Sequence, residues 1–175
     1  QNEEANVFIT TKKPQPPPPN NLNKSYTFDS FIQGSNSEFA KSASESVSEA
    51  PGKNSFNPLT IYGGVGLGKT HLLHSIGNQI HRNYPNSKVV IVTSEKFTLD
   101  FVNSLRKNRT IEFAQQYRNA DVLLIDDIQF FRGKEQTQEQ FFHTFNVLQQ
   151  SGKQIVMTAD KYPGEMKGLQ ERLLS

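Results

Sequence analysis

The sequence predicts an α/β fold in which a parallel sheet is covered by helices on both faces. Two hydrophobic patterns alternate after residue 50: short apolar runs typical of buried strands, and longer segments with an apolar residue every three or four positions, typical of amphipathic helices. A glycine-rich turn joins the first apolar run to the helical segment that follows. Because ligands of parallel sheets bind beyond the carboxyl ends of the strands, polar motifs at those ends are candidate site residues.

Each element can be placed from its own pattern. A helix is predicted over residues 35–50, with Phe39 and Val47 on its apolar face, and Pro51 ends it. The predicted strands are residues 59–62, 88–92, 122–125 and 154–158. The predicted helices between and around them are residues 69–84, 94–107, 111–117 and 136–150. This alternation indicates a parallel sheet.

The first two dozen residues predict a disordered, proline-rich linker. Pro14 and residues 16–19 favour an extended chain, and nothing beside them could build a core, so we expect order to begin near Tyr26. The domain boundaries that follow are residues 1–24 for the linker and residues 25–175 for one folded core.

Composition excludes several classes of protein. The hydrophobic fraction is 34% and the charged fraction 21%, and no apolar run approaches the roughly 20 residues of a membrane span. The chain has no cysteine, so disulfides, thiolate metal sites and cysteine nucleophiles are excluded. A reducing compartment fits this, and we expect a cytoplasmic protein. The net charge of +2 does not by itself indicate a nucleic-acid partner.

A phosphate-binding loop (P-loop) is predicted where the first strand meets the following helix. The segment GGVGLGKT fits the pattern G-x-x-x-x-G-K-[ST], in which glycines let backbone N–H groups converge on phosphate and a helix N-terminus faces the same anion. The alternative is a chance glycine turn, which the strand-to-helix context disfavours. Lys69 is expected on the β- and γ-phosphates and Thr70 on Mg²⁺. The predicted nucleotide-binding residues are Gly63, Gly64, Val65, Gly66, Leu67, Gly68, Lys69, Thr70 and His71.

Paired acids follow the third predicted strand. Asp126 and Asp127 end the run LLIDD, and two adjacent anions at a sheet edge are costly unless a cation offsets them. Because successive strand residues point to opposite faces, the two acids should act differently. We expect Asp126 to hold Mg²⁺ and Asp127 to polarise the attacking water. The alternative, a solvated turn, is weakened by the P-loop upstream.

A third polar group ends the last predicted strand. Thr158 or Asp160 would lie beside the γ-phosphate and could sense it or orient the water. The other interpretation is that Asp160 only begins the turn KYPG. Spacing alone does not separate these two interpretations.

Taken together, these motifs resemble one family. The segments GGVGLGKTHLLH, LLIDDIQFF, FFHTFN and TADKYP, with YTFDSFIQG and NPLTIYGG upstream, are similar to the bacterial DnaA family of chromosomal replication initiators, which are AAA+ ATPases. The resemblance runs from about residue 24 to the last residue. It implies a P-loop NTPase fold with a three-layer αβα AAA+ core, ATP and ADP as ligands with Mg²⁺, and slow ATP hydrolysis.

The resemblance also implies partners and further site residues. Family members assemble on ATP binding into a filament at the replication origin, where DNA opens, and a replicative helicase is a further partner of the full protein. Asp160 matches the sensor 1 acid and joins Lys69, Asp126 and Asp127 as a catalytic residue. Arg172 matches an arginine at the protomer interface. We expect the chain to end before the arginine finger, the lid and the duplex-binding domain of the family.

Contacts with single-stranded DNA are implied for the helices between the second and third strands. Val102 matches a contact position, and the nearby cations are Arg106, Lys107, Arg109 and Arg118. Cations beside apolar side chains suit a stretched phosphate backbone, although a solvated basic helix face explains them equally well. Gln136 stands where the family often has a basic residue, so a phosphate contact there is in doubt.

Other candidates and functions carry less support. His71, His74 and His143 are scattered, so a zinc site is not expected. Five aromatic residues are expected in packing rather than base stacking, namely Phe130, Phe131, Phe141, Phe142 and Phe145.

A small-molecule kinase would need an acceptor site that the sequence does not show. A helicase loader of the same clan is the closer alternative, although a loader should carry a partner-binding element where this chain has its proline-rich segment.

Overall fold

The computed structural model describes residues 21–34, 37–64, 66, 68–160 and 171. The elements in chain order are α1 (Glu38–Glu49), β1 (Leu59–Tyr62), α2 (Lys69–Asn83), β2 (Val89–Thr93), α3 (Ser94–Arg106), α4 (Thr110–Arg118), β3 (Val122–Asp126), the 3₁₀ helix η1 (Ile128–Phe131), α5 (Glu135–Gln150) and β4 (Gln154–Ala159). Every helix and strand predicted from the sequence is present, with ends shifted only slightly. The predicted linker residues 1–20 lie outside the described residues.

The four strands form one parallel sheet in the order β1-β4-β3-β2. Every residue of the two central strands, β3 and β4, is buried, whereas the edge strands β1 and β2 are partly exposed. Strands covered on both faces need apolar side chains on both faces, which explains the uninterrupted apolar runs in the sequence.

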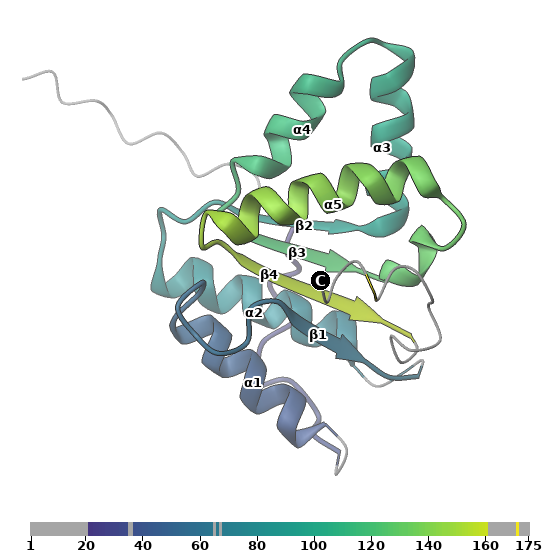
Figure 1. The fold of residues 1–175 in the computed structure, drawn as a ribbon. Coiled ribbons are helices and arrows are strands. Elements are labelled where there is room, and N and C mark those ends of the chain that lie inside the picture. The colour runs from purple at the N-terminus through teal and green to yellow at the C-terminus, as the bar shows by residue number, and fades with distance from the viewer. Residues whose placement is uncertain (1–20, 35–36, 65, 67, 161–170, 172–175) are drawn as a thin grey trace, which may run out of the picture.

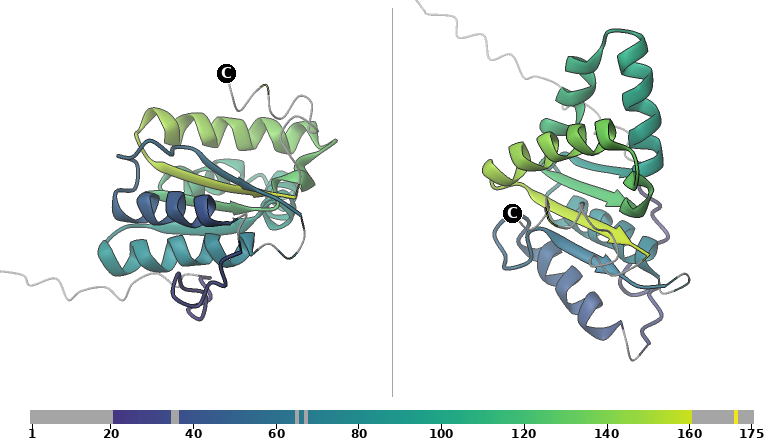
Figure 2. Two further views of the ribbon diagram at one scale, coloured as in Figure 1. Left: turned by 90° about the horizontal axis from the view of Figure 1, so that it is seen from below. Right: turned by 45° about the vertical axis from the view of Figure 1, so that its right-hand side comes forward.

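Helices cover both faces of the sheet (Figures 1 and 2). Helices α1 and α2 pack on one face in a core that includes Val47, Leu72 and Ile76. Helices α3, α4 and α5 enclose a second, aromatic-rich core on the other face, around Phe97 and Phe141. The predicted three-layer α/β architecture is therefore confirmed. Within the described residues, no helix is both long and apolar enough to cross a membrane.

The aromatic residues pack largely as predicted. Four of those expected in packing are buried, namely Phe131, Phe141, Phe142 and Phe145. Phe130 is 45% exposed. The prediction for Phe39 is wrong, because this residue of the first helical turn is 74% exposed and meets Phe56 edge-on. Helical periodicity shows which way a side chain faces, but not whether a partner lies opposite it near the end of a helix.

An N-terminal strap, residues 21–34, lies along the outside of α2 (Figure 2). Leu22 is buried, the Asn23 N–H donates to His74 Nδ1 at 3.0 Å, and the Asn78 amide donates to the carbonyl oxygens of Asn23 and Tyr26 at 2.9 Å. Packed structure therefore starts before Tyr26. The sequence missed this because the strap has no periodicity of its own and is fixed by polar contacts to α2.

Gly77 lets the strap and the sheet approach α2 closely. A Cβ at this position would lie 2.5 Å from a methyl group of Leu22 and 2.9 Å from one of Leu124. The glycine weakens the helix by about 1 kcal/mol relative to alanine, so its presence indicates a packing requirement.

We therefore predict that Gly77→Ala destabilises the protein despite its better helix propensity. Overpacking of this kind costs about 1–3 kcal/mol, more than the gain in propensity. Chemical denaturation should show a lower free energy of unfolding. Ser42→Ala, on the exposed face of α1, is the control and should be neutral or slightly stabilising. An increase in stability for Gly77→Ala would contradict this account.

Candidate nucleotide-binding site

The P-loop lies where the order of strands reverses. From β1 the chain crosses by α2 to β2 at the far edge, and later returns to β4 beside β1. The Gly63 N–H donates to the Ala159 carbonyl oxygen at 3.2 Å, which ties the start of the loop to the end of β4. Ligands of open α/β sheets bind at such a point, beyond the carboxyl ends of the strands.

Glycine conformation shapes this loop. Gly66 and Gly68 have φ of 85° and 78°, in the left-handed region that other residues seldom adopt. At Gly68 a Cβ would also lie 2.6 Å from the ring of Phe31, so the strap packs directly against the loop. Gly68 caps the N-terminus of α2 without a side-chain bond, which leaves the first N–H groups of the helix for an anion. Val65 and Leu67 lie outside the described residues.

Lys69 bends back over the loop. Its Nζ donates to the carbonyl oxygens of Gly63 at 2.5 Å and Gly64 at 2.9 Å. The ammonium group thus lies at the loop itself, where the motif predicts phosphate.

Asp126 is a buried carboxylate held by two hydroxyl groups. It is 6% exposed, Thr70 Oγ1 donates to its Oδ2 at 2.8 Å, and Thr158 Oγ1 donates to its Oδ1. Among the described residues, no lysine or arginine forms an ion pair with Asp126. A buried anion without a counter-charge is costly, so this site favours a cation.

The oxygen atoms at this position suit Mg²⁺. Thr70 and Asp126 offer the hard oxygen ligands that this ion prefers. The described residues contain no group of three or more histidine, aspartate or glutamate side chains that could hold a metal by themselves. An ion bound here would therefore complete its shell with water and phosphate oxygens, as Mg²⁺ commonly does.

Asp127 lies outside strand β3, which corrects the argument from strand alternation. Its φ and ψ are 59° and 54°, so the chain turns sharply there and begins η1. Its N–H donates to Thr158 Oγ1 at 2.9 Å, and Ser94 Oγ donates to its carbonyl oxygen. The two acids do differ in environment, but the cause is this left-handed turn rather than the pleat of the strand.

The electrostatic environment of Asp127 favours proton uptake compared with a free aspartate. Burial, and after it the charge of Asp126, raises the pKa of Asp127 above its ordinary value. A hydrogen bond from Gln129 and the charge of Lys69 act in the opposite direction, and Asp160 adds to the increase. A carboxylate with a raised pKa is a better proton acceptor, as a general base requires.

Asp160 directly follows β4 and has an unsatisfied oxygen. Its Oδ1 is buried without a hydrogen-bond partner among the described residues, and its N–H donates to Gln129 Oε1 at 3.2 Å. Its role as a sensor stays a prediction. Thr158, the other candidate, already has its hydroxyl between the two acids, so it positions them rather than reaching outward.

Three contributors to the site were not identified as such from the sequence. They are Ser94, Thr158 in its role between the acids, and Gln129. Ser94 and Thr158 could have been identified from the sequence, because both are hydroxyl residues at the carboxyl end of a strand. Gln129 could not be found in this way, since its contacts depend on the turn at Asp127.

Two histidines of α2, His71 and His74, face the strap. His71 Nε2 lies 2.7 Å from the Thr27 carbonyl oxygen, and its ring lies against those of Tyr26 and Phe31. Burial lowers the pKa of His74, which keeps its Nδ1 free to accept the hydrogen bond from the strap. Because the ring of His71 contacts the strap, its backbone is the part that remains for the predicted nucleotide contact.

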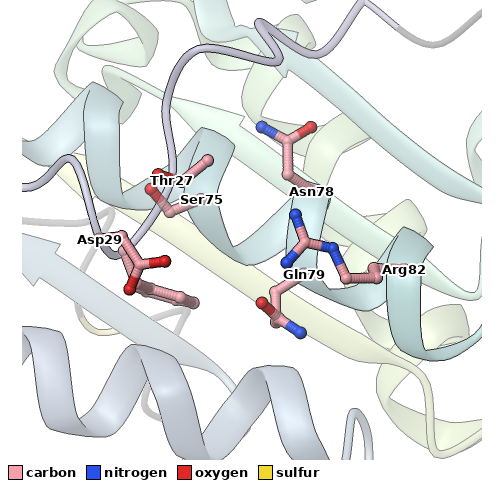
Figure 3. A pocket seen from close by; sticks show the side chains of 7 residues that line it. Thr27, Asp29, Ser75, Asn78, Gln79 and Arg82 are labelled. Carbon is pink, nitrogen blue, oxygen red and sulfur yellow. The ribbon is translucent and has the colours of Figure 1, made fainter.

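A hollow lies between the strap and α2 (Figure 3). Asp29 of the strap and Arg82 of α2 lie on opposite sides of it. Its lining residues are Thr27, Phe28, Asp29, Ser75, Asn78, Gln79 and Arg82. None of the predicted nucleotide-binding residues is among them, so this hollow is separate from the P-loop site.

The candidate DNA contacts lie on the hairpin of α3 and α4, which projects from the sheet (Figure 1). Val102 is half-buried, and Leu99 and Ile111 are 58% and 74% exposed. The nearby cations Arg106, Lys107, Arg109 and Arg118 are all exposed. Gln136 is exposed near the start of α5. Arg172, the predicted interface residue, lies outside the described residues.

Several known structures are similar to this chain in both fold and sequence. Domain III of the replication initiation protein DnaA from Thermotoga maritima is 47% identical, with a TM-score of 0.82, over 86% of this chain and 64% of that chain. AMPPCP-bound DnaA from Aquifex aeolicus is 38% identical, with a TM-score of 0.83, over 89% of this chain and 48% of that chain. A replication initiator DnaA bound to AMPPCP and single-stranded DNA gives the same four values. This chain spans less than two thirds of the length of each of these three DnaA chains.

A more distant match shows the fold alone. The DnaC helicase loader is 16% identical, with a TM-score of 0.71, over 85% of this chain and 87% of that chain. The family model of the bacterial DnaA ATPase domain, in contrast, matches residues 22–175, nearly the whole described region. This match, the high identity to DnaA structures and the geometry around the P-loop agree, and the chain belongs to the bacterial DnaA ATPase-domain family.

Proposed function

We propose that this chain is the ATP-binding core of a chromosomal replication initiator, which binds ATP with Mg²⁺ and hydrolyses it slowly. The observation that carries the proposal is the hydrogen bond between Thr70 and Asp126, 56 positions apart in sequence, at the mouth of the P-loop. It brings the two predicted magnesium ligands to one point, and the ammonium group of Lys69 lies on the same loop, at the Gly63 carbonyl oxygen. Bound Mg²⁺ would neutralise charge on the phosphates.

Each residue of the site has a separate role in binding or hydrolysis. Lys69 and the N-terminus of α2 bind the phosphates, and Thr70 and Asp126 hold the ion. Asp127, with its raised pKa, accepts a proton from the attacking water. Asp160 Oδ1, which has no hydrogen-bond partner among the described residues, would serve as a further polar contact for water or phosphate.

DNA binding and self-assembly complete the proposal. The structure of a DnaA bound to single-stranded DNA supports DNA as a partner. The contact would be made by the α3–α4 hairpin, where the cations Arg106 and Lys107 are exposed and Val102 is half-buried. Arg172 would lie at an interface between copies in an oligomer or filament at the origin, and a replicative helicase would be a further partner. A proline-rich linker that ends before the packed strap at residue 21, rather than at residue 24, belongs to the same proposal, as does a cytoplasmic, nucleoid-associated location.

A helicase loader is the alternative function. Loaders share the fold at much lower identity, and the DnaA family model favours the initiator. The two functions differ in what ATP controls: self-assembly on DNA for an initiator, and capture of the helicase for a loader.

We predict that Lys69→Ala and Asp127→Ala separate binding from hydrolysis. Lys69→Ala should abolish ATP binding measured by calorimetry, because the phosphates lose their cation. Asp127→Ala should bind ATP normally but lower the single-turnover hydrolysis rate by about 10²-fold or more, as loss of a general base does. Normal ATP affinity in Lys69→Ala would refute the proposed site.

We predict that Thr158→Val impairs Mg²⁺-dependent nucleotide binding. It leaves Asp126 Oδ1 and the Asp127 N–H without their hydroxyl partner, at a cost of about 1–3 kcal/mol for each buried group. Thr144→Val is the matched control, since Thr144 is equally buried but bonds only within its own helix, to Gln140. Equal ATP affinity, with and without Mg²⁺, in both variants would argue against the role of Thr158.

We predict that Arg106→Ala combined with Lys107→Ala weakens binding of single-stranded DNA. Losing two phosphate contacts should reduce the slope of log affinity against log salt concentration by about 1.4. Fluorescence anisotropy at several salt concentrations measures this. Lys24→Ala with Lys53→Ala removes the same charge from exposed positions elsewhere. An equal effect of the control pair would leave only a general charge effect and exclude a specific DNA contact.

A further inference from the structure

Gln129 connects Asp127, the proposed general base, with the backbone of Asp160. It is the second residue of η1 and is half-buried. Its Nε2 donates to Asp127 Oδ1 at 3.4 Å, and its Oε1 accepts a hydrogen bond from the Asp160 N–H at 3.2 Å. One side chain thus connects the turn after β3 with the end of β4, 31 positions away.

The side chain of Asp127 needs such a partner. Its backbone is fixed on both sides, by Thr158 at the N–H and by Ser94 at the carbonyl oxygen. Among the described residues, however, Gln129 alone provides a hydrogen bond to its carboxylate. Without it, the carboxylate could rotate about the Cα–Cβ bond and lose the direction that proton transfer requires.

An amide is the side chain that fits both contacts. It carries a donor and an acceptor at one end and has no charge. The donor faces the carboxylate of Asp127 and the acceptor faces a backbone N–H. Because Asp127 and Asp160 repel each other, a neutral side chain can link the Asp127 carboxylate to the Asp160 backbone without adding a third negative charge.

We propose that Gln129 is a positioning residue for ATP hydrolysis, which orients the carboxylate of Asp127 relative to the end of β4. This inference rests on the proposed function, because it assumes that Asp127 acts on the attacking water. Gln129 has no hydrogen bond to Lys69, Thr70 or Asp126 among the described residues. It therefore affects the hydrolysis step and leaves nucleotide affinity unchanged.

Two substitutions of Gln129 distinguish this role from simple packing. Gln129→Glu keeps the size and the acceptor but places a carboxylate against that of Asp127. Gln129→Leu keeps most of the volume and removes both hydrogen bonds. If Gln129 only filled space, the closely isosteric Glu variant would be the milder one. If it positions Asp127 through its N–H, the Glu variant is at least as damaging as the Leu variant.

The experiment measures ATP affinity, KM and kcat for each variant in the full-length chain. We expect kcat to fall about 10- to 100-fold in both variants, the scale of a misplaced catalytic group, with ATP affinity and KM within about twofold of the parent protein. Gln138→Leu is the matched control, because Gln138 also bonds to η1, through the Phe131 carbonyl oxygen, but touches neither acid. This control should retain its kcat.

Each outcome decides the matter. Unchanged kcat in Gln129→Glu, a fall in Gln138→Leu as large as in the Gln129 variants, or a milder effect of Glu than of Leu would each overturn the inference. If Gln129→Leu does not fold, Gln129→Glu and the control decide it alone. Asp127→Ala is measured alongside: full hydrolysis in that variant would overturn the proposed function itself, whereas inactive Asp127→Ala with fully active Gln129 variants would overturn only the role of Gln129.

Discussion

A carboxylate placed almost out of contact with water, at the end of a central strand, is the constraint on which this site depends. Asp126 cannot be stable there as an isolated anion, and the molecule meets the cost with two hydroxyl groups, one from the first turn of α2 and one from β4. These bonds fix the P-loop helix and the two central strands relative to one another. The two hydroxyl groups leave the negative charge of Asp126 without a counter-charge. The site therefore favours a cation, and the cation in turn favours an anionic ligand.

The strap extends this arrangement beyond the sheet. Phe31 lies where a side chain at position 68 would be, and the polar groups of α2 hold the strap backbone along the helix. At the other end of the strap, Gly77 leaves room for Leu22 to pack against α2. Thus one helix carries the phosphate-binding turn, a face of the core and the strap, and a shift of α2 would be felt at all three.

Sequence reasoning predicted the elements, the parallel sheet and the position of the P-loop, because these depend on local periodicity and on residue types at fixed spacing. It failed for Phe39, whose exposure depends on what lies beyond the end of a helix, and for Leu22 and Asn23, which are held by contacts to α2. It also missed the roles of Thr158 and Gln129. Thr158 and its partner Asp127, like Gln129 and its partner Asp160, are 31 positions apart, and the register between β3 and β4 brings them together. The other partner of Gln129, Asp127, is two positions away but is reached only because the chain turns there.

The left-handed backbone at Asp127 limits which residues can occupy that position. Among residues other than glycine, aspartate and asparagine adopt this conformation with least difficulty, and of these only aspartate is an acid. Glutamate offers the same charge, but its longer side chain lacks this tolerance and would carry the carboxylate past the amide of Gln129. The shape of the turn and the chemistry of the site therefore select the same amino acid independently, and a change to the other acidic residue would require the turn to be rebuilt.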